Sequence, residues 1–370
     1  MHPVDLFKRL WICALAGLLL LALPPLAQAA DTIQVTDLTG RKVTAPLNPS
    51  RIVCLGPGCL RLIVYLEAQD KVVGIEALEK RFPHGRPYYY AKPELSKLPV
   101  ITPGGVPAIN NLPDLEGVLK AKPQVVFATY LQKAKADQLE SLLNIPVVVL
   151  SYGPFASFDK VVLDSILLAG RILGKDKRAQ ALVDQMEAWQ KDLARRGKAA
   201  KQRPGAYVGG IGFKGAHGLE STDPHYLPFR WVGAKNLAAS QKKAGHVMLD
   251  KEQLLGLNPE YIFVDGGGLS LVAADYAKKP EFYKHLKAFQ TDRVYLLHPF
   301  NWYTTNLGTA LADAYVIGKI LQPEEFKDVE PAAQADVIYT FLLGKPVYAA
   351  MAKRYGALGS TPPFMKESQK

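Results

Sequence analysis

The longest amphipathic pattern in the chain covers residues 157 to 196. Apolar residues recur there at spacings of three and four, which predicts helix with one apolar face. Gly174 interrupts the pattern and Asp176 is a residue type that caps helices, so we expect one helix to Leu173 and a second from about Lys177 to Arg196. A helix of this size spans about 30 Å, the width of a small domain. We interpret the second helix as a strut between two lobes; the alternative is an ordinary helix inside one large domain.

Short apolar runs alternate with helical patterns on both sides of this segment. RIVCL, KVVGI, QVVFA and IPVVVL precede it, and GAYVG, EYIFV and RVYLL follow it. Strands that alternate with helices indicate βαβ units and parallel sheets. The prediction is an α/β protein of two lobes, each with a central, mainly parallel sheet, joined by a single long helix. The predicted boundaries are a signal peptide at 1–29, a first lobe at 30–156, a helical linker at 157–200, a second lobe at 201–355 and a flexible tail at 356–370.

Residues 79–113 are rich in proline and contain Tyr88, Tyr89 and Tyr90 in succession. A long irregular segment of this kind is commonly functional or mobile. We expect it to be a loop at the rim of the first lobe. The three tyrosines then form either an exposed patch or an anchor that holds the loop to the lobe.

One helix, stop and strand unit occurs on each side of the predicted strut. LEGVLKAKPQVVFAT contains Glu116 seven residues before Pro123, and KEQLLGLNPEYIFVD contains Glu252 seven residues before Pro259. Both glutamates fall in the first turn of a predicted helix, where a carboxylate complements the positive end of the helix dipole. The repetition indicates two lobes of similar architecture.

The first 29 residues have the three parts of a secretory signal. Lys8 and Arg9 precede an apolar run from Leu10 to Leu23, and Ala27-Gln28-Ala29 offers a cleavage site. The run is too short to span a bilayer as a stable helix, so we expect a mature protein in the periplasm. Removal of the segment leaves 43 basic and 33 acidic residues, a net charge of +10. The positive charge is dispersed, which favours an anionic ligand over a nucleic acid.

Cys54 and Cys59 are the two cysteines beyond the signal segment. An oxidising compartment permits a bridge between them. A strand residue and a residue five positions later, across a turn, usually point apart, which favours free thiols.

The loops at the carboxyl ends of the predicted strands are the expected place for a ligand, because ligands of open α/β sheets bind beyond these ends. These loops contain aromatic and cationic side chains that would line a cleft between the lobes and suit a large, partly apolar ligand that carries charge. The candidates are Tyr130, Tyr152, Lys214, His217, Trp302 and Tyr303. Trp302 is the first choice for contact, although it could instead be packed at the base of its loop. Tyr and His also coordinate ferric iron, but a direct metal ligand is not predicted.

Several of these segments together resemble a known family. TDLTGRKV, RIVCLGPG and the paired LEGVLKAKP and KEQLLGLNP units are similar to those of periplasmic iron-siderophore and vitamin B12 binding proteins of ABC importers. The resemblance implies two α/β lobes joined by one long helix, with a ligand in the cleft and little closing motion. It also implies a membrane permease and its ATPase as partners, with Glu116 and Glu252 pairing with permease arginines.

The leading hypothesis is a monomeric periplasmic binding protein that captures a ferric siderophore and has no cofactor of its own. A corrinoid or haem is the next candidate cargo, followed by a bare metal ion or an oxyanion. A secreted enzyme is less favoured, because no GxSxG motif or metal-hydrolase spacing occurs in the chain.

Overall fold

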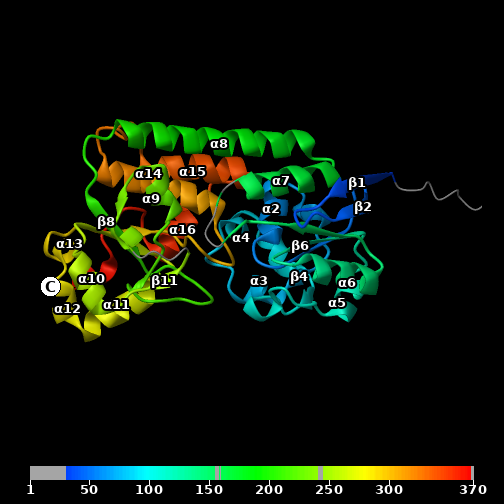
Figure 1. The fold of residues 1–370 in the computed structure, drawn as a ribbon, viewed down its shortest axis with the longest axis horizontal. Coiled ribbons are helices and arrows are strands. Elements are labelled where there is room, and N and C mark those ends of the chain that lie inside the picture. Colours follow the sequence, from blue (N-terminus) through cyan, green and yellow to red (C-terminus); the bar gives the residue numbers. More distant parts are fainter. Residues whose placement is uncertain (1–30, 155–157, 159, 241–244, 368–370) are drawn as a thin grey trace, which may run out of the picture. The chain divides into compact units, whose positions relative to one another are not determined.

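The computed structural model describes residues 31–154, 158, 160–240 and 245–367 of the chain, so the predicted signal peptide lies outside the described residues. Residues 33–370 form one compact unit. Its first part contains strands and helices up to the turn before residue 155 (Figure 1). They are β1 (Thr32–Thr36), β2 (Lys42–Pro46), β3 (Ile52–Leu55), α2 (Cys59–Tyr65), β4 (Ile75–Glu76), α3 (Ala77–Arg81), α4 (Pro87–Ala91), β5 (Val100–Thr102), α5 (Leu115–Lys120), β6 (Val125–Thr129), α6 (Lys133–Leu143) and β7 (Val147–Leu150), with 3-10 turns at Gln69–Lys71, Pro93–Lys97 and Val106–Ala108.

Two longer helices follow, and then the second set of strands and helices. The helices are α7 (Lys160–Ile172) and α8 (Asp176–Ala199). The remaining elements are β8 (Gly205–Gly209), β9 (Ser221–Thr222), α9 (Leu227–Trp231), β10 (Lys235–Asn236), a 3-10 turn (Leu237–Ser240), β11 (Val247–Met248), α10 (Lys251–Leu257), β12 (Tyr261–Asp265), α11 (Leu269–Lys278), α12 (Pro280–Lys284), α13 (Lys287–Gln290), β13 (Val294–Leu297), α14 (Leu307–Leu321), α15 (Pro331–Leu343), α16 (Tyr348–Tyr355) and α17 (Pro363–Glu367).

Each lobe is built on a parallel sheet, which confirms the predicted fold class. In the first lobe the strand order is β3-β6-β7 and all pairs are parallel. In the second lobe the order is β10-β8-β12-β13, again with parallel pairs. β3, β6 and β7 are continuous runs of mostly β-branched residues, and every residue in them is buried. Burial on both faces is what a parallel sheet covered by helices requires.

The predicted strut is α8, a helix of 24 residues. Its apolar face is buried through Ala179, Leu182, Met186 and Leu193, as the spacing predicted. Asp176 is the first helical residue, whereas Lys175 occupies the capping position and makes no side-chain cap. The lobes are joined by more than this helix. One continuous apolar core beneath α7, α8, α14 and α15 contains residues of both sheets, including Phe127 and Phe263.

The segment 79–113 differs from the predicted loop. It contains α3, α4 and β5, and β5 pairs with β4 in parallel. Proline is the first residue of α4, a position where its missing N–H costs no hydrogen bond. Tyr88 and Tyr89 are buried rather than gathered in an exposed patch, so of the two predicted roles the anchor is the one observed.

Residues 356–367, the described part of the predicted tail, are packed rather than frayed. Leu358 and Met365 are buried, and Ser360 accepts a hydrogen bond from the backbone N–H of Leu296 in β13. Within the described part of the chain, no helix combines the length and apolar character needed to cross a membrane.

Candidate functional site

The loop 298–306, between β13 and α14, carries the main polar contacts between the lobes. Arg61 of α2 donates from Nη1 to the carbonyl oxygen of Thr305 at 2.7 Å and from Nη2 to that of Trp302 at 3.0 Å. Asn306 Nδ2 donates to the carbonyl oxygen of Gly85 in the first lobe at 2.8 Å. We call this loop, together with the first-lobe residues that it contacts, the inter-lobe junction.

A carboxylate of the first lobe holds a tyrosine of the second at this junction. Tyr303 donates its hydroxyl to Glu76 Oε2 at 2.6 Å, and the same hydroxyl accepts the N–H of Gly105 at 3.0 Å. The other oxygen of Glu76 accepts the N–H of Gly56 at 3.0 Å. Burial raises the pKa of Glu76 to about 7, although the hydrogen bonds from Tyr303 and Gly56 favour its ionised form. Tyr303 has a left-handed φ of 57°, an uncommon conformation for a non-glycine residue.

A buried ion pair lies close to this tyrosine. Arg86 and Glu79 approach to 3.1 Å between Nη1 and Oε2, and both side chains are nearly inaccessible to solvent. Tyr88 donates to the same Glu79 oxygen at 2.8 Å. The Arg86 guanidinium lies 5.2 Å from the ring centroid of Tyr89 and 5.9 Å from that of Tyr303. Carboxylate and aromatic neighbours keep the pKa of Arg86 above its ordinary value against the opposing effect of burial, so it stays cationic.

The structure brings together four of the six predicted ligand residues at the junction. Tyr130 and Thr304 share a hydrogen bond of 2.6 Å between their hydroxyls, which joins the lobes. Tyr152 is buried, donates to the carbonyl oxygen of Gly58 and accepts from Arg61. Its hydroxyl therefore faces the protein interior, whereas the sequence predicted a side chain that lines the cleft.

Trp302 and Tyr303 complete this group. The indole Nε1 of Trp302 donates to the carbonyl oxygen of Phe82 at 2.9 Å. The indole lies flat against Gly85, where a Cβ would come within 2.1 Å of Trp302 Cδ2. Only a residue without a side chain fits there, so Gly85 is part of how Trp302 is seated. Whether these aromatic residues contact cargo stays a prediction.

Lys214 and His217 lie in the neighbouring loop 210–220 of the second lobe. His217 Nε2 is 2.7 Å from the carbonyl oxygen of Phe213, and the Lys214 ammonium lies 5.4 Å from the Phe213 ring centroid. The rings of His217 and His246 are 5.4 Å apart between centroids. Asn301 links this loop to the junction through a 2.6 Å hydrogen bond from its Nδ2 to Gly212.

The predicted site residues omit the junction's charged groups. The positive charge of Arg61 could bind an anionic chelate. Its burial and its contacts with the second lobe depend on tertiary packing, which the sequence does not show. Glu76 is the last residue of β4, which places it at the carboxyl end of a parallel strand, and this signal could have identified it. Arg86 belongs to the segment predicted to be a loop.

Several buried polar atoms at the junction have no hydrogen-bond partner among the described residues. The donors are Arg61 Nε, Arg86 Nε and the hydroxyl of Tyr89, and the acceptors are on Thr305 and Asn306. An unpaired buried polar atom costs about 1–3 kcal/mol, so such atoms usually indicate a place for water or a ligand. Here two of the unpartnered atoms belong to guanidinium groups.

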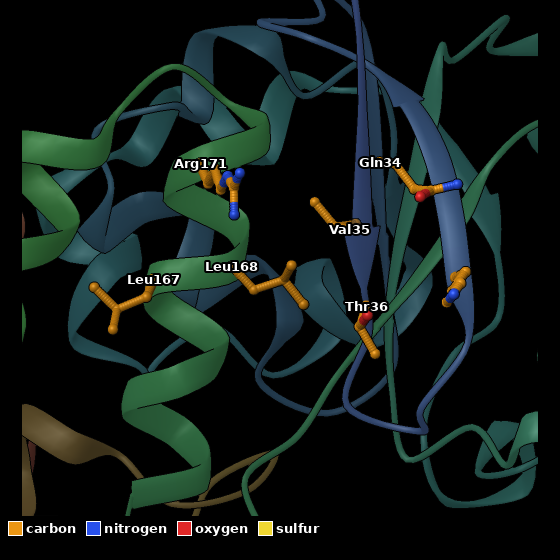
Figure 2. Close-up of a pocket in the computed structure, with 7 residues that line it drawn as sticks. Gln34, Val35, Thr36, Leu167, Leu168 and Arg171 are labelled. Atoms are coloured by element: carbon orange, nitrogen blue, oxygen red, sulfur yellow. The ribbon is translucent and has the colours of Figure 1, made fainter.

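A shallow hollow of about 450 Å³ lies elsewhere, between β1 and α7 (Figure 2). Val35 and Leu168 point toward each other across it, and Gln34, Thr36 and Arg171 line its edges. It shares none of its lining residues with the junction. The described residues also contain no group of three or more His, Cys, Asp or Glu side chains arranged to hold a metal ion.

Cys54 and Cys59 are free and buried, which agrees with the favoured expectation of no bridge. Burial raises the pKa of the Cys54 thiol, and the Cys59 side chain raises it further.

Glu116 and Glu252 occupy matching positions in the two lobes. Each is the second residue of its helix, α5 or α10, and each is exposed. Asp114 and Asp250 cap the two helices by accepting the N–H of the third helical residue. The predicted first-turn placement is confirmed, whereas the docking role of the glutamates is not tested by their position.

Two parallel-sheet lobes with a shared core and a polar junction between them are the architecture of a substrate-binding protein. The family model described as "Periplasmic binding protein" matches residues 52–299, and the chain belongs to this family. Members of the family serve transport as binding proteins rather than as enzymes, which places this chain among the substrate-binding proteins of ABC transporters.

Two curated relatives are similar over most of the chain. The molybdate-binding protein MolA of Haemophilus influenzae is 27% identical over 324 residues, with 81% of this chain and 88% of MolA covered. The uncharacterised ABC transporter substrate-binding lipoprotein YvrC of Bacillus subtilis is 25% identical over 308 residues, with 80% and 87% covered.

Solved structures show the same fold. MolA bound to molybdate superposes with a TM-score of 0.68 at 24% identity and covers 85% of this chain and 98% of its own. Helicobacter pylori CeuE in a nickel and histidine complex gives a TM-score of 0.62 at 20% identity and covers 87% and 98%. These comparisons do not confirm an iron chelate as the cargo.

Proposed function

We propose that this chain captures a small oxyanion, with molybdate as the first candidate, at the inter-lobe junction and delivers it to an ABC permease and its ATPase. The observation that carries the proposal is the pair of buried guanidinium groups, Arg61 and Arg86, whose Nε donors are unpartnered. Guanidinium groups recognise oxyanions through paired N–H donors. The similarity to a molybdate-binding relative supports the same class of cargo.

The charges at the junction also favour an anion. Arg86 forms an ion pair with Glu79, and burial raises the pKa of Glu76 to about 7. Around neutral pH a fraction of Glu76 is therefore protonated, and the cluster carries a net positive charge. An anion that entered after the lobes separated would gain partners for donors that are otherwise unpaired.

The ferric siderophore expected from the sequence is the second candidate. It is supported by the half-buried Trp302 and Tyr303, which place aromatic surface beside the cationic cluster. An anionic iron chelate would use both features, whereas molybdate needs only the donors. The two candidates therefore make different demands on Trp302.

Titration calorimetry on the purified mature protein tests the proposal. Sodium molybdate is expected to bind saturably with one site per chain, and Arg61→Met is expected to abolish this binding. Arg171→Met removes an exposed arginine away from the junction and serves as the matched control. A ferric tricatecholate that binds where molybdate does not would move the assignment to the second candidate. Failure of both ligands would remove the junction as an anion site.

Docking to the permease is the second part of the proposal. Glu116 and Glu252 are exposed carboxylates that suit charge pairs with basic residues of a partner. Changing both to Ala is expected to leave cargo binding intact and to weaken uptake. Loss of cargo binding instead would contradict the docking role.

The predicted signal peptide at 1–29 places the mature monomer in the periplasm, and N-terminal sequencing of the secreted protein checks the cleavage site.

A further inference from the structure

The indole of Trp302 reaches from the second lobe onto the backbone of the first. Its Nε1 donates to the carbonyl oxygen of Phe82 at 2.9 Å, and the same oxygen accepts a hydrogen bond from Arg86 Nη2 at 2.8 Å. One acceptor is therefore shared between a second-lobe side chain and a buried guanidinium group that the proposed function assigns to cargo binding. Release of the indole changes the surroundings of that guanidinium group.

Gly85 provides the space that this indole occupies. A Cβ at Gly85 would lie 2.1, 2.3 and 2.6 Å from Trp302 Cδ2, Cγ and Cε3, far closer than two carbon atoms pack. Gly85 does not have a left-handed φ, so alanine at this position would meet the indole without adding backbone strain. Asn306 Nδ2 donates to the carbonyl oxygen of Gly85 at 2.8 Å. Two side chains of the loop 298–306 therefore hold the segment 82–85.

The turn that carries Trp302 has a strained backbone. Tyr303 and Thr304 have φ of 57° and 67°, and a left-handed φ in a β-branched residue such as threonine is an outlier. Such conformations persist where surrounding contacts enforce them. Here the first lobe supplies contacts to both residues: Tyr303 donates to Glu76 at 2.6 Å, and Thr304 shares a 2.6 Å hydrogen bond with Tyr130. Separation of the lobes removes these contacts and lets the turn relax, which offsets part of the free energy that separation costs.

We propose that the contact of Trp302 with Gly85 is a latch that sets how fast cargo enters and leaves the inter-lobe junction. The indole and the carbonyl group of Phe82 are both neutral, so water can replace their hydrogen bond at a small net cost. The latch can therefore open and close repeatedly while the buried pair of Arg86 with Glu79 stays intact within the first lobe. The inference rests on the proposed function for the cargo, whereas the latch itself belongs to the cargo-free protein.

Hydrogen exchange in the cargo-free mature protein tests the latch. The N–H of Gly105 reports separation of the lobes, because it donates across the junction to the Tyr303 hydroxyl at 3.0 Å. Its exchange rate, measured by NMR, is expected to rise at least about tenfold in Gly85→Ala, which corresponds to about 1.4 kcal/mol lost from the closed state. The N–H of Val126, inside the first-lobe sheet, should exchange at an unchanged rate. Gly256→Ala, whose Cβ would meet nothing within 4 Å, is the matched control and should change neither rate.

A double variant separates the latch from a general loss of stability. Trp302→Ala removes the indole, so it is expected to speed exchange at Gly105 as Gly85→Ala does, and it provides the same test if Gly85→Ala does not fold. In the Trp302→Ala background, Gly85→Ala is expected to add less than about twofold, because the group that its Cβ would meet is gone. A tenfold effect of Gly85→Ala without the indole would overturn the latch.

Stopped-flow mixing with sodium molybdate, followed by tryptophan fluorescence, connects the latch to cargo exchange. The association and dissociation rate constants are both expected to rise at least about tenfold in Gly85→Ala, because the open state is more populated, and to stay unchanged in Gly256→Ala. Unchanged rate constants beside faster exchange at Gly105 would overturn the control of cargo passage. If the unmodified protein does not bind molybdate, the proposed function fails for that cargo. Faster exchange at Gly105 then still supports the latch, and unchanged exchange overturns it.

Discussion

The two sides of the inter-lobe junction differ in the kind of group that they contribute. The first lobe supplies ionisable side chains that are almost fully buried, namely Arg61, Glu76, Glu79 and Arg86. The second lobe supplies the loop 298–306. This loop forms its hydrogen bonds through backbone carbonyl groups and neutral side chains such as Tyr303. The ion pair at the junction, Arg86 with Glu79, lies within the first lobe. Arg61 instead donates to carbonyl groups of the second lobe.

The largest expected effect comes from the charged side. Arg86→Met leaves Glu79 buried without its cation, and the loss of one partner of a buried pair typically costs about 3–5 kcal/mol of unfolding free energy. Denaturant unfolding of the cargo-free protein measures it. Lys160→Met breaks an exposed pair with Asp164 at 2.6 Å and is the control, with an expected cost below about 1 kcal/mol. Equal costs for the two variants would mean that burial does not distinguish them.

The next effect depends on pH. The folded-state pKa of Glu76 is raised to about 7 from an ordinary value of 4.5. The stability that it contributes is therefore fully present below about pH 4.5 and is lost as the pH rises through 7, a change of about 3 kcal/mol. Glu76→Gln cannot ionise, and it should flatten this part of the profile of unfolding free energy against pH.

A second buried carboxyl provides the internal comparison. Burial also raises the pKa of Asp265, at the end of β12, to about 7. The slope that remains in Glu76→Gln should therefore be reduced further by Asp265→Asn. A Glu76→Gln profile as steep as that of the unmodified protein would show that the first-lobe carboxylate does not titrate in this range.

The third effect concerns Trp302 in the second-lobe loop 298–306. It distinguishes an iron chelate from molybdate as the cargo. Trp302→Ala removes an aromatic surface that lies against Gly85 and a hydrogen bond to Phe82. For an iron chelate that contacts the indole, the expected loss of affinity is about 2 kcal/mol or more. For molybdate held by the guanidinium groups the expected loss is smaller. Calorimetry with sodium molybdate and with a ferric tricatecholate measures both, and Phe82→Ala, which keeps the accepting carbonyl group, is the control.

Features of the fold that depend on local sequence could be predicted, and features that depend on contacts distant in sequence could not. The two lobes and α8 could be predicted because periodicity is local, and Leu182, Met186 and Leu193 are indeed buried on one face. The first-turn positions of Glu116 and Glu252 were also predictable, since an aspartate cap precedes each. Tertiary packing decided the rest. α4 begins at a proline that was interpreted as loop, and Tyr88 is buried because Glu79 and Arg61 lie around it.

The rule that ligands lie beyond strand ends identified Tyr130 and Tyr303. Both lie at the junction, where Tyr130 contacts Thr304 and Tyr303 contacts Glu76. Their contact with cargo stays a prediction. The rule cannot tell whether a hydroxyl faces the ligand or the protein. Tyr152 faces the protein because Gly58 and Arg61 satisfy it. Arg86 could not be identified from the sequence, because its contact with Tyr303 joins residues that are far apart in the chain.

The smallest expected effect on stability comes from removing one hydroxyl of the second lobe, that of Tyr303. Tyr303→Phe removes the donor to Glu76 and leaves the N–H of Gly105 without its acceptor, at an expected cost of about 1–2 kcal/mol in unfolding free energy. Because that hydrogen bond favours the ionised carboxylate, its loss should also raise the pKa of Glu76 above 7. The fall of stability, which begins near the ordinary pKa of 4.5, should then continue to a higher pH. Tyr295→Phe, in β13 and stacked on Tyr261, is the control. A stability loss without any shift of the pH profile would mean that Tyr303 packs against the first lobe but does not set the charge of Glu76.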